Sequence, residues 1–315
     1  MSTTQWCTRA SVLLLGSLLA GGCASTPING PDPVEVPPGL DVSLPFPIDR
    51  GEEGPSTPGS YKGLWLRLVD NGTPTVTPVD GIIGVVCIGM SNSNQECADF
   101  ITRRDGQYAA EINPAVRVVN CAVGGNAIEK WIDPAADGPL WDACITTRLA
   151  QAGVRLDQVR VLYHKAANQF TTAAGGGALP TYPAAGSDYD NFRGNLAAFA
   201  ARVKTKFPAV QAVYTSSRSY GGFSGGVSRG EPLSYEEGHA LNAWLADNPV
   251  VQSVWYGWGP YLWAPDCAST TTNGGGVCYN RADYVADGVH PSGSGTAKVS
   301  GLIHARLLRE AWYRR

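Results

Sequence analysis

Residues 81–96 read GIIGVVCIGMSNSNQE, an apolar run that ends in Gly89 and continues into Ser91, Asn92 and Ser93. The run through Gly89 is typical of a β-strand that is covered on both faces. The polar residues after it allow two interpretations. Ser and Asn are ordinary helix N-caps, or Ser91 is a nucleophile at the carboxyl end of a strand. The rest of the chain decides between them.

Apolar strand patterns alternate with helical patterns from about residue 81 onwards. The further runs rich in β-branched residues are 116–123, 159–167, 210–217 and 250–258, and the helical stretches between them are roughly 94–106, 138–152, 187–206 and 233–246, with a last helix from about residue 292. This alternation predicts an α/β fold in which right-handed crossovers link five parallel strands in a three-layer α/β/α arrangement. In such sheets, ligands bind at the carboxyl ends of the strands.

A serine nucleophile needs a base, and the segments at those strand ends provide a candidate. Of the four His, His164 lies in an apolar strand pattern and His239 and His304 lie in helical patterns, so structural roles are expected for these three. His290 lies in the loop DGVHPSGSG, three residues after Asp287. A carboxylate at that spacing can hold one ring nitrogen while the other faces a serine.

Attack by a serine on a carbonyl also places negative charge on the oxygen, which requires hydrogen-bond donors. The expected donors are the backbone amides of Ser91 and Gly125 and the side chain of Asn168. Gly125 belongs to VNCAVGGNAIEKW after the second strand, and Asn168 belongs to HKAANQF after the third.

The four blocks, in this order, resemble the SGNH (GDSL-like) hydrolase superfamily over roughly residues 81–315. The resemblance implies the flavodoxin-like SGNH fold, with Ser91 as nucleophile, Gly125 and Asn168 in the oxyanion hole, and Asp287 and His290 completing a triad. Some positions depart from the family pattern. Met90 stands where many members have Asp, Ala122 and Gly124 replace Gly and Ser of the second block, and AANQ (166–169) replaces the usual Gly-x-Asn-Asp.

Aromatic and cationic residues after the strands favour a carbohydrate substrate. Expected substrate-binding residues are Trp131, Arg218, Tyr220, Trp258 and Trp263, because aromatic faces suit sugar rings and a cation suits an anionic substituent. An alternative is that these Trp residues anchor the core. The leading hypothesis is a carboxylic-ester hydrolase that removes acetyl groups from carbohydrate. A lipase or short-chain esterase is the alternative, and a catalytically silent glycan-binding protein is the alternative of another class.

The N-terminal residues predict export. The apolar run SVLLLGSLLA is too short for a permanent membrane-spanning helix and is typical of a signal peptide. It ends in Ala20-Gly21-Gly22-Cys23, which resembles a bacterial lipobox. We expect a signal peptide at 1–22, lipidation of Cys23, a Pro/Gly-rich tether over 23–60 and a hydrolase domain over 61–315 that opens with a hairpin over 61–80.

The protein would be a lipoprotein of the outer membrane, facing the periplasm or the surface. An ordinary signal peptide, which gives a secreted or periplasmic soluble protein, is the alternative.

The remaining composition restricts partners and redox state. A net charge of −3 without basic tracts gives no indication of nucleic acid, and a monomer that needs neither metal nor organic cofactor is expected. Cys87, Cys97, Cys121, Cys144, Cys267 and Cys278 remain after Cys7 and Cys23 are set aside. An even count in an exported protein predicts three disulfides. Cys267 and Cys278 are expected to pair, and the other four allow three pairings.

Overall fold

The computed structural model describes residues 68–315, apart from 136–137, 181, 183, 226–228 and 269–276. The expected signal peptide 1–22, Cys23, the tether 23–60 and the first part of the expected hairpin lie outside the described residues.

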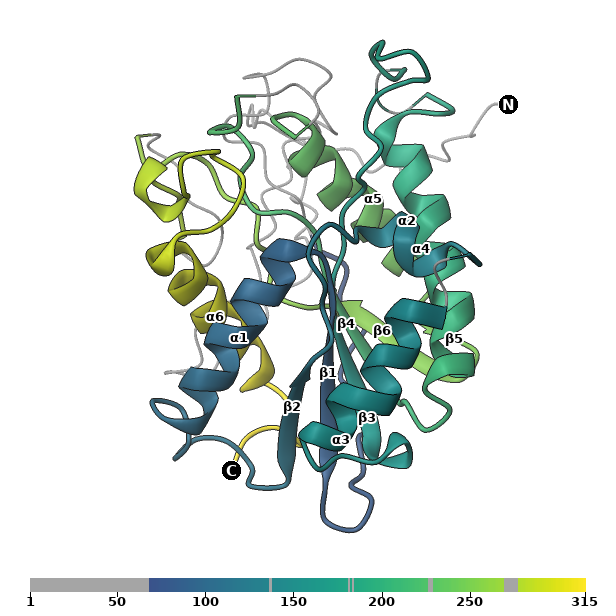
Figure 1. The fold of residues 1–315 in the computed structure, drawn as a ribbon, viewed down its shortest axis with the longest axis vertical. Helices are drawn as coiled ribbons and strands as arrows, with labels where there is room; N and C mark the ends of the chain where they lie inside the picture. The colour runs from purple at the N-terminus through teal and green to yellow at the C-terminus, as the bar shows by residue number, and fades with distance from the viewer. Residues whose placement is uncertain (1–67, 136–137, 181, 183, 226–228, 269–276) are drawn as a thin grey trace, which may run out of the picture. The chain divides into compact units, whose positions relative to one another are not determined.

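A single sheet forms the centre of the described domain (Figure 1). Its order is β2-β1-β3-β4-β6-β5, and its strands are β1 (Ile83–Gly89), β2 (Val116–Asn120), β3 (Val159–Lys165), β4 (Ala212–Ser216), β5 (Val250–Val251) and β6 (Val254–Trp258). All pairs are parallel except β5 with β6. The five parallel strands therefore have the flavodoxin-like order.

The expected fifth strand over 250–258 is in fact two strands, so the sheet has six strands and not five. Gln252 and Ser253 have φ values of +50° and +63°, and Val251 pairs with Val254 across them. Positive φ at both central residues is the geometry of a two-residue hairpin turn. The apolar run concealed this turn because neither residue is the Asn or Gly that usually marks it.

The expected hairpin over 61–80 is wrong in its described part. Residues 68–80 contain only an isolated bridge from Val79 to Ile82. The side chain of Asn71, within this segment, donates to the carbonyls of Leu245 (3.0 Å) and Tyr256 (2.9 Å). The segment is held against the α/β domain and does not pair with itself.

Helices cover both faces of the sheet (Figure 1). Helices α1 (Ser91–Asp105) and α6 (Gly293–Leu307) pack together on one face. The other face carries α2 (Ile128–Ile132), the π-type helix Gly138–Arg148 with its continuation α3 (Leu149–Gln151), α4 (Asp188–Lys206) and α5 (Leu233–Asp247). Short 3-10 turns lie at Leu156–Gln158 and Arg281–Asp283.

The strand residues alternate between two apolar cores, which confirms the three-layer α/β/α prediction. Val86 and Ile88 of β1 face the core that includes α4 and α5. Val85 and Cys87 face the core that includes α1 and α6. Because every residue of β1 is buried, its sequence is apolar without the polar alternation of a half-exposed strand.

Three disulfides brace this domain: Cys87–Cys97, Cys121–Cys144 and the expected Cys267–Cys278. The first joins β1 to α1, on either side of Ser91. Within the described part of the chain, no helix combines the length and the apolar character needed to cross a bilayer.

Candidate active site

A cavity of about 310 Å³ opens where the parallel strands end. Its walls come from the segments that follow β1, β2, β3 and β4 and from the loop before α6. Ser91, Gly125, Asn168, Arg218 and His290 all contribute to the lining. Ser91 and His290, which are 199 residues apart in sequence, thus meet at the carboxyl ends of the parallel strands. Ligands bind at this edge in open α/β sheets.

Ser91 is the first residue of α1, so its backbone N–H is one of the donors that have no partner within the helix. Gly89 makes this tight passage from strand to helix possible. Its φ is +149°, and an added Cβ would lie 2.3 Å from Ser93 Oγ and 2.5 Å from the carbonyl oxygen of Lys165. Only glycine fits here, which explains the Gly of the sequence Gly-x-Ser.

Asp287 both folds the loop that carries His290 and holds the imidazole. Its Oδ1 accepts hydrogen bonds from the backbone N–H groups of Val289 (2.8 Å) and His290 (3.0 Å). Its Oδ2 lies 2.6 Å from His290 Nδ1. Burial opposes ionisation of this carboxyl, but the hydrogen bonds from the His290 side chain and the two N–H groups outweigh it and lower the pKa of Asp287 to about 2. The carboxylate is therefore charged at neutral pH.

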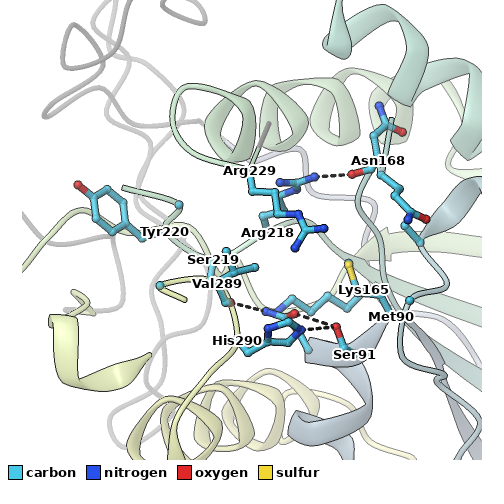
Figure 2. A pocket seen from close by; sticks show the side chains of 16 residues that line it. Met90, Ser91, Lys165, Asn168, Arg218, Ser219, Tyr220, Arg229, Val289 and His290 are labelled. Atoms are coloured by element: carbon cyan, nitrogen blue, oxygen red, sulfur yellow. Dashed lines mark hydrogen bonds between the residues drawn. The ribbon is translucent and has the colours of Figure 1, made fainter. Parts of the chain in front are cut away.

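The other imidazole nitrogen faces the serine (Figure 2). His290 Nε2 lies 2.8 Å from Ser91 Oγ. With Nδ1 donating to the carboxylate, Nε2 carries the lone pair and can accept the hydroxyl proton. The three side chains form one continuous hydrogen-bonded line from carboxylate to hydroxyl.

Gly125 lies at the cavity wall, in the turn closed by the hydrogen bond from the Asn126 N–H to the Val123 carbonyl. Its φ is +75°, and an added Cβ would meet no atom within 4 Å. The neighbouring Gly124 lies close to the serine, since a Cβ there would be 3.8 Å from Ser91 Cβ. The turn therefore brings backbone, and no side chain, next to the serine.

The side chain of Asn168 does not donate into the cavity in this structure, contrary to the expectation. Its Nδ2 donates to Asp188, to Oδ1 at 2.9 Å and to the carbonyl at 3.3 Å. Its Oδ1 accepts from Asn195 (2.9 Å). Figure 2 shows the side chain directed away from Ser91. Both amide protons are engaged because a buried carboxyl lies behind Asn168, which the sequence could not indicate.

Three of the five residues expected to bind substrate are core residues. Trp131, Trp258 and Trp263 are at most 2% exposed, and none of them lines the cavity. Each indole N–H has an internal acceptor: Asn126 O (3.1 Å), Asn242 Oδ1 (2.9 Å) and Glu231 Oε1 (3.0 Å), respectively. The alternative that these residues anchor the core is correct for all three.

Arg218 and Tyr220 do line the cavity. Arg218 donates to the carbonyl of Asn168 and pairs with Glu237, whose Oε2 lies 2.8 Å from its Nε. Tyr220 lies at the far side from Ser91 in Figure 2. Its ring packs edge-on against the ring of Phe223, with 5.1 Å between the ring centroids.

Two cationic residues of the cavity were missed by the sequence reasoning. Lys165, the last residue of β3, pairs with Glu96 of α1 at 2.5 Å. Arg229 reaches the cavity from the segment before α5. Lys165 is the last residue of an apolar strand, so its position at the strand end was a usable signal. Arg229 stands in a run of Gly and Ser that gave none.

The other three His lie elsewhere. Burial lowers the pKa of His164 to about 3 and that of His239 to about 4. His164 stacks on Phe199 at 3.8 Å, and His304 stacks on Tyr108 at the same distance. These packed positions agree with the structural roles expected for them.

The chain is similar in structure to several solved hydrolases. A lipase/acylhydrolase from Enterococcus faecalis aligns at TM-score 0.43 and 16% identity, over 72% of this chain and 96% of that one. A GDSL-like lipase from Bacteroides thetaiotaomicron aligns at 0.39 and 15%, over 73% and 89%. A catalytic mutant of an acetylxylan esterase from Geobacillus stearothermophilus aligns at 0.42 and 13%, over 74% and 97%.

No protein-family model matches the sequence, and no curated protein matches it. At these identities the likeness concerns the fold and does not decide the activity. In fold, the chain is similar to GDSL-like lipases, acylhydrolases and esterases.

Proposed function

We propose that the chain is a serine carboxylic-ester hydrolase in which Ser91 is the nucleophile, His290 the general base and Asp287 the orienting carboxylate. The observation that carries this proposal is the line of contacts, 2.8 Å from Ser91 Oγ to His290 Nε2 and 2.6 Å from His290 Nδ1 to Asp287 Oδ2. Both distances lie within hydrogen-bond reach, as proton transfer requires.

The first half-reaction forms an acyl-enzyme. Ser91 Oγ attacks the ester carbonyl carbon while its proton passes to His290 Nε2. The tetrahedral intermediate then collapses, the alcohol leaves with that proton, and the acyl group stays on Ser91. In the second half-reaction, water attacks the acyl-enzyme, gives a proton to His290, and releases the carboxylic acid with the Ser91 hydroxyl restored. Asp287 stabilises the imidazolium that forms twice in each cycle.

Backbone amides stabilise the oxyanion in this proposal. The Ser91 N–H lies at the N-terminus of the 15-residue helix α1, where the helix dipole favours negative charge. The Gly125 N–H is the second donor, on the neighbouring turn. Removal of one such donor typically costs about 2.7–4 kcal/mol of transition-state stabilisation. Asn168 supplies a third donor only if its side chain leaves Asp188.

A short acyl group on a carbohydrate alcohol is the proposed substrate. A volume of about 310 Å³ is at the lower end for ligand cavities, which favours a small acyl group over a long lipid chain. Asn92, Gln169 and Ser219 add hydrogen-bonding groups to the walls, which suits a polyol. Trp131, Trp258 and Trp263 do not support a carbohydrate substrate, because they are buried and cannot stack on a sugar ring.

Acetate release from acetylated oligosaccharides, compared with hydrolysis of p-nitrophenyl esters of increasing chain length, tests the proposal. We expect acetyl esters to be hydrolysed best and Ser91→Ala to abolish turnover. A preference for long chains would instead identify a lipase. Glycan binding without turnover of any ester would identify a binding protein. No metal takes part in this mechanism, so a chelator should leave the rate unchanged.

We also propose that residues 1–22 are a signal peptide and that Cys23 is lipidated and anchors the protein to the outer membrane. The lipobox-like sequence Ala20-Gly21-Gly22-Cys23 supports this. Cys23→Ser should move the protein from the membrane fraction to the soluble exported fraction. Equal partition of both forms would contradict lipidation.

A further inference from the structure

The described lining of the catalytic cavity is cationic. It includes Lys165, Arg218 and Arg229 together with His290, and none of the described lining residues is Asp or Glu. Such a wall does not arise from the overall charge of the chain, which is −3. The three cations differ in whether a carboxylate of the protein lies beside them.

Two of the three cations form ion pairs with buried carboxylates behind the cavity wall. Lys165 Nζ lies 2.5 Å from Glu96 Oε1, and both side chains are at most 2% exposed. Arg218 Nε lies 2.8 Å from Oε2 of the buried Glu237, and its Nη2 donates to the carbonyl of Asn168. Both cations therefore have a carboxylate partner within the protein.

Arg229 is different. Its side chain is exposed, and among the described residues nothing forms an ion pair or a side-chain hydrogen bond with it. Figure 2 shows its guanidinium group in the cavity next to that of Arg218, on the side of Ser91 and His290. Five N–H donors in a rigid fork therefore face the space that a bound ester would occupy.

We propose that Arg229 binds a carboxylate on the substrate, so that the enzyme prefers esters whose alcohol part is anionic, such as an acetylated acidic sugar. This inference rests on the proposed ester hydrolysis and names the substrate class. A carboxylate matches the guanidinium fork with two parallel hydrogen bonds. It also relieves the repulsion between two guanidinium groups that share a cavity, of which only one has an internal partner.

A matched pair of small acetyl esters tests the preference. The probes are 4-acetoxybenzoate, which carries a carboxylate, and 4-acetoxybenzamide, which has the same shape without the charge. The measured quantity is the ratio of kcat/KM for the anion to that for the amide. Because the intrinsic reactivity of each ester is the same for every variant, a change in this ratio reports recognition of the charge alone.

We expect Arg229→Gln to lower this ratio by about 10- to 100-fold, the usual range for a charge-assisted hydrogen bond. Arg229→Lys should keep the charge and recover part of the ratio. The matched control is Arg117→Gln on β2, outside the cavity lining, and it should leave the ratio at the wild-type value. In wild-type protein, the ratio should also fall as salt is raised from 0.05 to 0.5 M, a readout that needs no variant.

The outcomes separate the two proposals. If wild-type protein hydrolyses both esters with a ratio that neither Arg229→Gln nor salt changes, the ester hydrolase stands and the role of Arg229 is wrong. If wild-type protein hydrolyses neither ester, the proposed function itself fails, and the substrate class fails with it.

Discussion

Asn92, the residue after Ser91, donates a hydrogen bond of 2.9 Å from its Nδ2 to the backbone carbonyl of Val289, the residue before His290. The chain neighbours of the nucleophile and of the base are thus joined directly. The start of α1 and the C-terminal loop are fixed to each other by a bond that involves neither reacting side chain. Asn92 is therefore a positioning residue for the Ser91–His290 contact.

Loss of this bond should affect activity more than stability. Asn92→Ala should lower kcat about 3- to 10-fold, because one neutral hydrogen bond contributes about 0.5–1.5 kcal/mol and small misplacements slow reactions between oriented groups. Asn113→Ala is the matched control, since Asn113 makes a similar bond of 3.0 Å to the carbonyl of Trp312 away from the cavity. Equal kcat losses in the two variants, measured on a p-nitrophenyl acetate assay, would contradict the positioning role.

The acid limb of the activity profile should reflect a single proton. The hydrogen bonds to Asp287 lower its pKa to about 2 against the effect of burial, so this carboxylate stays charged at any pH used in assays. Activity should fall with decreasing pH in one step as His290 gains a proton, because only the neutral imidazole accepts from Ser91. A profile of log(kcat/KM) with a slope of two on its acid limb would argue against this assignment.

Acid should also destabilise the fold through a histidine outside the site. Burial lowers the pKa of His164 to about 3, whereas in the unfolded chain it is about 6.5. The unfolded state alone binds this proton between the two values, so stability falls as pH drops below about 6.5. At pH 5 the loss is about 2 kcal/mol.

Urea denaturation at pH 7.5 and pH 5 measures this effect. His164→Leu should lose less stability than wild type between the two conditions. Ser217→Ala, a change at another buried position, should lose as much as wild type. A His164→Leu variant with the pH dependence of wild type would show that other groups carry the effect.

The Cys87–Cys97 disulfide closes a loop that contains Ser91. Replacement of both cysteines by Ala should lower the free energy of unfolding by about 2–5 kcal/mol and should also lower kcat, because the tie between β1 and α1 is lost. The double replacement at Cys267 and Cys278, outside the cavity lining, should reduce stability with little change in kcat. Both variants are assayed at a temperature where circular dichroism shows them folded, and an unchanged kcat without Cys87–Cys97 would contradict the bracing role.

Gly89 allows a direct steric test of the passage from strand to helix. An added Cβ would lie 2.5 Å from the backbone carbonyl of Lys165, which cannot move without shifting β3. Gly89→Ala should therefore destabilise the protein by about 1–3 kcal/mol and displace Ser91. Gly194→Ala, where no atom lies within 4 Å of the added Cβ, should not destabilise it. Thermal unfolding of the two variants provides the comparison.

Much of this architecture could be predicted because its signals are local. The strand that precedes Ser91 is apolar at nearly every position, and the loop with Asp287 and His290 has a distinctive spacing. The expected helix after the first strand began at residue 94, but α1 begins at Ser91. Ser91, Asn92 and Ser93, which the sequence offered as N-cap residues or as a nucleophile and its neighbours, already form the first turn of this helix.

The failures concern direction and distant contacts. A Trp after a strand carries no mark of which way its ring points, and Trp131, Trp258 and Trp263 all point into the core. The engagement of Asn168 by Asp188 joins positions 20 residues apart through tertiary packing. Arg229 is recognisable as a cavity residue only when the segments after β4 and before α5 are placed in space.

The most direct test of the account is covalent labelling of the purified protein by a fluorophosphonate, followed by mapping of the modified peptide. The account predicts a single phosphonylated residue, Ser91, with labelling abolished in Ser91→Ala and strongly slowed in His290→Ala. A protein that hydrolyses esters but carries the label on another residue, or that takes up no label at all, would contradict it.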